Sequence, residues 1–214
     1  MIFQRLHSCL HRKAVKRILI SFAAMGLLLV ILTLAAGTER VGNRLLFYVH
    51  VARLYTESPD SKIVMPLKDL SKKQITDTWH APRGSERLHE GQDIFAAKGT
   101  PIYSATSGYV YKVGEDNLGG HTVSVIGAGA RIYYYAHLDS YAPNLSVGYR
   151  VTTRTLLGYV GTTGNASGTP PHLHFGVYAV DGAINPLPLL TDRPAESKKK
   201  ETKTAKTKST PRAK

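Results

Sequence analysis

The 214-residue chain has a single cysteine, Cys9, close to its N-terminus. Everything that follows must therefore fold without disulfide bonds, and no cysteine thiolate is present there to hold a purely structural zinc ion. The sequence also lacks a G-x-S-x-G motif, the usual signature of an α/β-hydrolase serine nucleophile. A cysteine-free stretch of this length points to a domain held together by its apolar core alone.

Acidic residues are scarce at both ends of the chain. Asp and Glu total 15 against 28 Lys and Arg, a formal net charge of +13. Residues 1–17 contain five basic residues and no acidic one, and residues 193–214 contain nine basic residues against two acidic ones. Residues 18–192 are therefore nearly neutral, and the basicity belongs to a basic leader and a basic tail.

A long uncharged run follows the basic leader. Residues 18–36, ILISFAAMGLLLVILTLAA, are enough to cross the roughly 30 Å hydrocarbon layer as a helix. A cleaved signal peptide is the alternative, but its apolar region is usually only about 7–15 residues long. We expect an uncleaved, single-pass anchor in the inner (cytoplasmic) membrane. The basic leader would lie in the cytoplasm, and the rest of the chain would lie outside, in the periplasm.

The remaining chain divides into three parts. Residues 37–63 are expected to form a juxtamembrane helix and a linker, because apolar residues recur at helical spacing over 41–55. Residues 64–192 contain short runs rich in Val, Ile, Tyr and Thr, separated by glycine-containing turns. They predict a mainly β domain, an antiparallel sandwich or barrel-like fold, with strands over 108–114, 121–127, 131–138, 156–161 and 172–180.

The tail, residues 193–214, has no apolar periodicity and is expected to be disordered. A solvated tail is the simpler interpretation, and contact with an anionic polymer or lipid headgroups is the alternative. Nucleic acid is the generic partner of such a basic run, but the exported topology argues against it.

Six of the nine histidines fall between residues 80 and 174. His172 and His174 lie in the strand-like run TPPHLHFGVY, so they face the same side, roughly 7 Å apart. Such a pair is either a metal or catalytic site or two surface histidines. His89 and Asp93, in HEGQD, are a weak signal alone, and the chain must fold back near Gly91 if both bind one ion. His137 is expected to end an apolar aromatic strand.

Taken together, these residues suit a hydrolytic zinc site. One carboxylate and two imidazoles can hold a zinc ion and leave a fourth position for water, whose pKa the metal lowers towards about 7. The two remaining imidazoles are then available for proton transfer and for stabilising an oxyanion. Spacing does not decide which of His172 and His174 binds the metal.

The ordered motifs HEGQD, YYAHLD, GTTGNASGTPPHLHFGVY and INP, preceded by DTWHAPRG, resemble the lysostaphin-type (LytM-like) zinc endopeptidases of bacterial cell walls. The resemblance covers roughly residues 64–190. It implies a metallopeptidase that binds one zinc ion and hydrolyses peptide bonds in the stem peptides or cross-bridges of peptidoglycan. The zinc ligands it implies are His89, Asp93 and His174, and the catalytic residues it implies are His137 and His172.

Two other functions remain open at this point. Some relatives have lost ligands and act as wall-binding or amidase-activating modules, and a zinc peptidase of this type can also act on peptides outside the wall. Three further residues near the motifs have more than one possible role. His80 can line the groove, add a ligand, or be an ordinary loop histidine, and Arg83 and Arg87 can meet substrate carboxylates.

Overall fold

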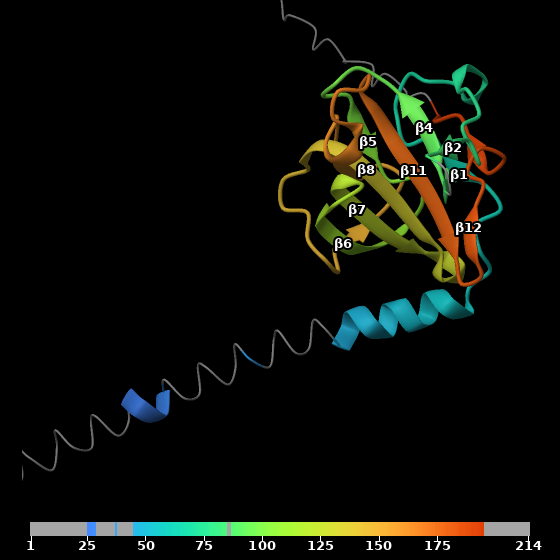
Figure 1. Cartoon of the computed structure of the whole chain (residues 1–214). Coiled ribbons are helices and arrows are strands. Elements are labelled where there is room, and N and C mark those ends of the chain that lie inside the picture. Colours follow the sequence, from blue (N-terminus) through green and yellow to red (C-terminus); the bar gives the residue numbers. More distant parts are fainter. Residues whose placement is uncertain (1–24, 29–36, 38–44, 85–86, 195–214) are drawn as a thin grey trace, which may run out of the picture.

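The computed structural model of the chain describes residues 25–28, 37, 45–84 and 87–194 (Figure 1). The predicted leader lies outside these residues, as do all but the first two residues of the predicted tail, and so does the predicted 18–36 span apart from 25–28. In this part of the chain no helix is long and apolar enough to cross a membrane. The membrane anchor therefore stays a prediction from the sequence.

The described residues are mainly β. A helix covers 45–56, within the stretch where the sequence shows apolar residues at helical spacing. The strands and 3₁₀ turns follow in the order β1 (Ile63–Val64), η1 (Lys72–Gln74), β2 (Pro82–Arg83), β3 (Arg87–Leu88), β4 (Gln92–Phe95), β5 (Pro101–Tyr103), β6 (Gly108–Asp116), β7 (Gly120–Gly127), η2 (Ala128–Ala130), β8 (Ile132–Tyr141), β9 (Arg150–Val151), β10 (Leu156–Val160), η3 (Gly164–Ala166), β11 (His172–Ala179), β12 (Gly182–Ile184) and β13 (Leu190–Thr191).

Nine of these strands form one hydrogen-bonded antiparallel sheet. Its main path runs β12-β11-β8-β7-β6-β9, while β4 pairs with β11, and β10 pairs with both β5 and β8. Two small sheets complete the domain, a parallel pair β1-β13 and the hairpin β2-β3. The mainly β, antiparallel prediction is confirmed, and the five strands expected from the sequence are β6, β7, β8, β10 and β11.

The core follows from the alternation of side chains along the central strands. On β8, Tyr133 and Tyr135 are fully buried, and on β11 Leu173, Phe175 and Val177 are fully buried as well. Successive residues of a strand face opposite sides, so the residues between them face away from this core. This is how β11 presents His172 and His174 on the face opposite its core side chains.

One prediction about β8 was wrong. His137 does not end the strand, because β8 continues to Tyr141. His137 has a left-handed backbone conformation, with φ of 63°, and the pairing of β7 with β8 is irregular between His121 and Val123. The strand is therefore distorted at His137 and continues beyond it, which sequence composition does not reveal.

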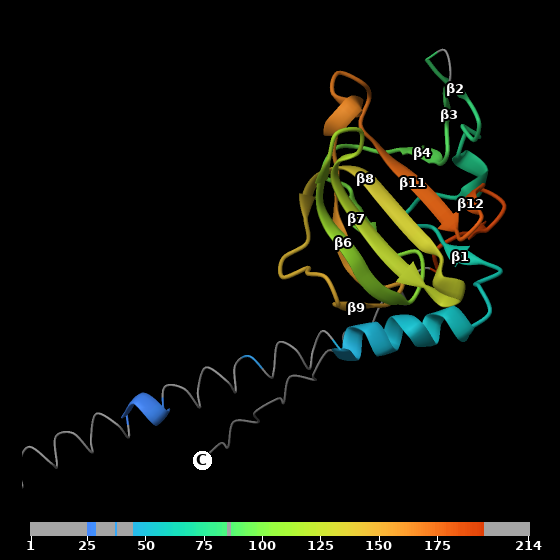
Figure 2. The same ribbon diagram turned by 60° about the horizontal axis from the view of Figure 1, so that its bottom comes forward.

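The 45–56 helix packs against one end of the sheet (Figure 2). Leu54 is buried with Ile126 and Ala130, and the His50 ring stacks on Tyr109 with centroids 5.0 Å apart. The hairpin β2-β3 and the turn η3 lie at the end of the domain remote from the helix (Figure 2). The helix and the candidate site described below therefore occupy opposite ends of the domain.

Candidate metal centre

The first two candidate ligands meet because the chain bends at Gly91. His89 follows β3, Asp93 belongs to β4, and Gly91 between them adopts a bend. The bend leaves the Nε2 atom of His89 3.1 Å from the Oδ1 atom of Asp93. A side chain at Gly91 would collide with the His174 ring, since a Cβ atom there would lie 2.4 Å from Cε1 of His174. The fold-back expected near this glycine is confirmed.

The third candidate ligand comes from β11, which lies between β4 and β8. His174 is paired with Asp93 on one side and with Ala136 on the other. Its Nδ1 atom lies 3.1 Å from Oδ1 of Asp93 and 2.8 Å from Nε2 of His89. Three donor atoms from separate parts of the chain therefore face one point.

The donor set fits a zinc ion. Nδ1 of His89 donates a hydrogen bond to the carbonyl oxygen of Thr78, at 2.6 Å, so the lone pair of this imidazole is on Nε2, the atom that faces the other ligands. A hydrogen bond from the outer nitrogen to a carbonyl is the usual support for a histidine that binds metal. Ligands of a tetrahedral zinc ion are about 3.3 Å apart, as follows from bonds of about 2.0–2.1 Å. The three donor-donor distances are slightly shorter, and all three groups are mostly buried.

Asp93 uses its two oxygens differently. Oδ1 faces the two imidazoles, while Oδ2 accepts a hydrogen bond from the guanidinium of Arg83 on β2. Burial acts to raise the pKa of Asp93, but hydrogen bonds and charge from His174 and His89 outweigh it and hold this pKa well below its ordinary value. The carboxylate is therefore ionised at neutral pH, as a metal ligand must be.

The two candidate catalytic histidines lie beside this group and have the same tautomer. Nδ1 of His137 donates to the carbonyl oxygen of Thr163, and Nδ1 of His172 donates to the carbonyl oxygen of Pro170, both at 2.9 Å. Each ring therefore carries its lone pair on Nε2. The ring centroids are 5.0 Å apart, and Nε2 of His172 lies 3.9 Å from Oδ1 of Asp93.

Burial lowers the pKa of His137 to about 4, although the hydrogen bond to the Thr163 carbonyl acts to raise it. Burial likewise lowers the pKa of His174. Both imidazoles are therefore neutral at neutral pH. A neutral His174 can bind a metal ion, and a neutral His137 can accept a proton.

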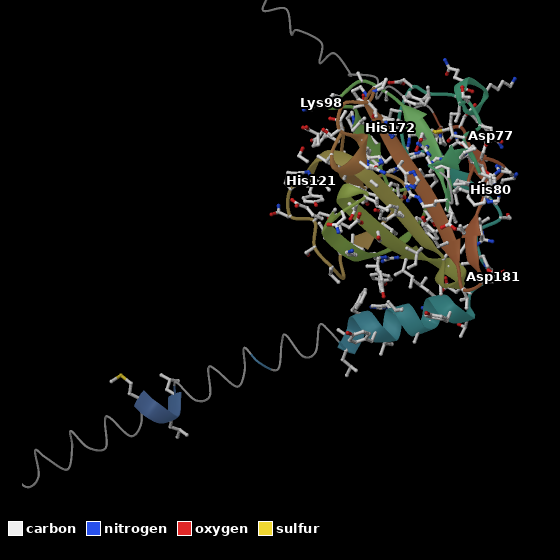
Figure 3. The ribbon with its side chains drawn as sticks, viewed as in Figure 1. Asp77, His80, Lys98, His121, His172 and Asp181 are labelled. Carbon is white, nitrogen blue, oxygen red and sulfur yellow. The ribbon has the colours of Figure 1, made fainter. Side chains whose placement is uncertain are left out.

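All five residues named by the sequence line one cavity of about 420 Å³. The arginines of the β2-β3 hairpin, Arg83 and Arg87, line it as well, as the sequence suggested. His80 and His121 are not among its lining residues. His80 is exposed and stacks on Trp79, and His121 contacts Glu115, so Figure 3 shows them on opposite sides of the domain from each other.

Sequence reasoning missed an acidic residue in the same cavity. Asp116, at the end of β6, accepts a hydrogen bond from the hydroxyl of Tyr134 at 2.7 Å and from the backbone N–H of Gly119 at 2.5 Å. Burial acts to raise the pKa of Asp116, but these hydrogen bonds lower it, so the carboxylate is ionised. The ring of Tyr134 meets that of His174 edge-on, with centroids 6.0 Å apart. Strand alternation could have placed Tyr134 on the cavity side of β8, since its neighbours Tyr133 and Tyr135 face the core.

Residues 87–186 match the sequence model of Peptidase family M23. The L-Ala--D-Glu endopeptidase of Bacillus subtilis is 33% identical over 136 residues, which are 58% of this chain and 42% of that protein. Lysostaphin of Staphylococcus simulans is 34% identical over 109 residues, 48% of this chain and 21% of that protein. The matched region thus spans less than half of these relatives.

The solved structure of Helicobacter pylori Csd3 is similar to this chain with a TM-score of 0.50 and 31% sequence identity. The likeness covers 64% of this chain and 36% of that one. The sequence match includes the three candidate metal ligands, His89, Asp93 and His174, and both neighbouring histidines, His137 and His172.

Proposed function

Because residues 87–186 form a domain of peptidase family M23, we propose that the chain is a zinc endopeptidase that hydrolyses peptide bonds in peptidoglycan. Peptidases of this family are zinc-dependent, and the His89–Asp93–His174 group is consistent with one zinc ion. The observation that carries the proposal is the convergence of these three donors with two further imidazoles, His137 and His172, in one cavity.

In this proposal His89, Asp93 and His174 hold the zinc ion. Bound there, zinc supplies Lewis-acid activation of water and of the peptide carbonyl. Asp93 adds the negative charge that balances part of the charge on the metal. The carbonyl oxygen of Thr78 fixes the ring of His89, and the bend at Gly91 leaves room for the ring of His174.

His137 and His172 share the movement of the proton and the stabilisation of charge. Each ring presents an unprotonated Nε2, and each is fixed through Nδ1 by a backbone carbonyl. One imidazole takes the proton from the attacking water, and while protonated it stabilises the neighbouring negative charge. It then passes the proton to the leaving amine and returns to its neutral form. Burial keeps His137 neutral before the reaction, so it is ready to accept the proton.

The substrate we propose is a peptide bond in the stem peptides or cross-bridges of the wall. Two relatives support it by name, the L-Ala--D-Glu endopeptidase of Bacillus subtilis and the peptidoglycan DD-endopeptidase ShyC of Vibrio cholerae. The alternative, a wall-binding or amidase-activating module without catalysis, is less well supported because all five site residues are present. A module of that kind has no need for a complete ligand set.

We also propose the division of the chain and its location from the sequence. Residues 18–36 would anchor the chain in the inner membrane, with the 1–17 leader in the cytoplasm and the 64–192 domain in the periplasm. Contact of the basic tail with an anionic polymer or lipid headgroups belongs to the same proposal. The uncharged run and the charge distribution support it.

Mass analysis of fragments released from purified peptidoglycan tests the function. The full-length protein in detergent should release peptides with new amino termini, and a chelator should stop this release. Binding to the wall at one equivalent without any release, with or without zinc, would favour the non-catalytic module instead. Release from other peptides but not from wall would favour a peptidase of a different substrate class.

A further inference from the structure

The 45–56 helix has two apolar faces, and only one of them contacts the domain. The inner face places Val51 and Leu54 against the cluster formed with Ile126, and the ring of Phe47 meets that of Tyr109 edge-on. These contacts fix the helix on the end of the sheet.

The outer face is also apolar, yet it is exposed. Leu45, Tyr48, Val49 and Tyr55 are 57–65% exposed. Their spacing of three, four and ten residues places them on one side of a helix, and Ala52 lies among them. A helix that is apolar on opposite sides is normally covered on both, and a continuous exposed apolar stripe marks an interaction surface.

The position of the helix makes a lipid bilayer the occupant that fits best. Only eight residues, 37–44, separate it from the uncharged 18–36 run. Fully extended, they reach about 28 Å at most, so the helix cannot move far from a membrane that holds that run. Tyrosines on the apolar face, with Arg53 beside it, are residues that favour the interface of an anionic bilayer.

We propose that the outer face of the 45–56 helix lies on the lipid surface and directs the metal centre away from the membrane. The inference rests on the proposed anchoring by residues 18–36. Because the helix and the metal centre are at opposite ends of the domain, this contact would turn the cavity toward the wall (Figures 2 and 3). The bilayer contact would thus orient the domain so that its cavity faces away from the membrane.

Depth-dependent fluorescence quenching tests the contact in the full-length chain. Cys9 is replaced by Ser, and one fluorescent label is attached through Tyr48→Cys on the outer face or, as a matched control, through Lys98→Cys. Lys98 is exposed and lies at the end of the domain remote from the helix (Figure 3). Both proteins are reconstituted in vesicles of phosphatidylethanolamine and phosphatidylglycerol with brominated acyl chains.

The proposal predicts quenching at position 48 that is several-fold greater than at position 98. Equal, weak quenching at both positions in protein that floats with the vesicles would overturn it and leave the anchor intact. Protein that does not float would overturn the anchor and the contact together. Disulfide cross-linking between Tyr48→Cys copies, without quenching, would assign the face to a second copy of the chain. Hydrolysis of wall fragments by the same variants tests the enzymatic proposal separately.

Discussion

Replacing His137 by asparagine should stop hydrolysis and leave zinc binding intact. The ring is 6% exposed, donates through Nδ1 to the Thr163 carbonyl and lies outside the three groups whose donors converge. A general base or acid contributes about 10²–10⁴-fold in rate, which is about 3–6 kcal/mol of activation free energy. Asparagine is chosen because His137 has φ of 63°, a conformation that asparagine tolerates better than alanine does.

The assay measures two quantities on the same protein, the rate of peptide release from purified wall and the zinc content. The expected result is a rate at least a hundredfold lower, with about one zinc per chain retained. His121→Asn is the matched control, because His121 contacts Glu115 and does not line the cavity, and it should keep the parent rate. A His137→Asn protein that works within threefold of the parent, or that loses its zinc, would refute the assignment.

Three further predictions concern the metal centre. Arg83→Ala should raise the dissociation constant for zinc by about tenfold, because the guanidinium of Arg83 holds Oδ2 of Asp93, and Arg83→Lys should have a smaller effect. Competition with a chelating dye measures the dissociation constant, and an unchanged value in Arg83→Ala would contradict the prediction. Gly91→Ala should lower zinc affinity by at least about tenfold in the same assay, since the added Cβ meets the His174 ring at 2.4 Å. In chelator, the free energy of unfolding should fall by up to about 3 kcal/mol as the pH drops from 6.5 to about 4. The unfolded chain protonates His137 in that window while the folded chain keeps it neutral, and urea denaturation that shows a flat profile would exclude this effect.

Much of the fold follows from local sequence signals. Runs of β-branched and aromatic residues bounded by glycine turns predicted β6, β7, β8, β10 and β11, because such residues pack well on a pleated surface. Alternation placed the two histidines of β11 on one face. The pairing order of nine strands in one sheet depends on contacts between distant segments, which local patterns do not encode.

The residue types of the site were predictable, but their arrangement was not. Gly91 between His89 and Asp93 signalled the fold-back, and the structure has a bend there. The distortion of β8 at His137 depends on its neighbours β7 and η3, so the sequence wrongly suggested a strand end. Asp116 lines the cavity together with Leu118 and Gly119 of the β6-β7 turn, and no local motif marks that approach.

The same limit explains the contact between Arg83 and Asp93. These residues are ten positions apart, and their meeting requires the β2-β3 hairpin to fold back over β4. The sequence suggested that Arg83 can meet a substrate carboxylate, whereas in the structure its guanidinium contacts Asp93, a candidate metal ligand. An arginine side chain is long enough to serve either purpose, so only the folded position distinguishes them.

X-ray absorption at the zinc edge of the full-length protein, loaded with one equivalent of zinc, tests the central claim most directly. We predict two imidazole nitrogens and oxygen ligands at about 2.0–2.1 Å, with no sulfur, and the loss of one imidazole in the His174→Ala variant but not in His137→Asn. A spectrum with no imidazole scattering, or one that stays unchanged in His174→Ala, would contradict the assignment of His89, Asp93 and His174 as the zinc ligands.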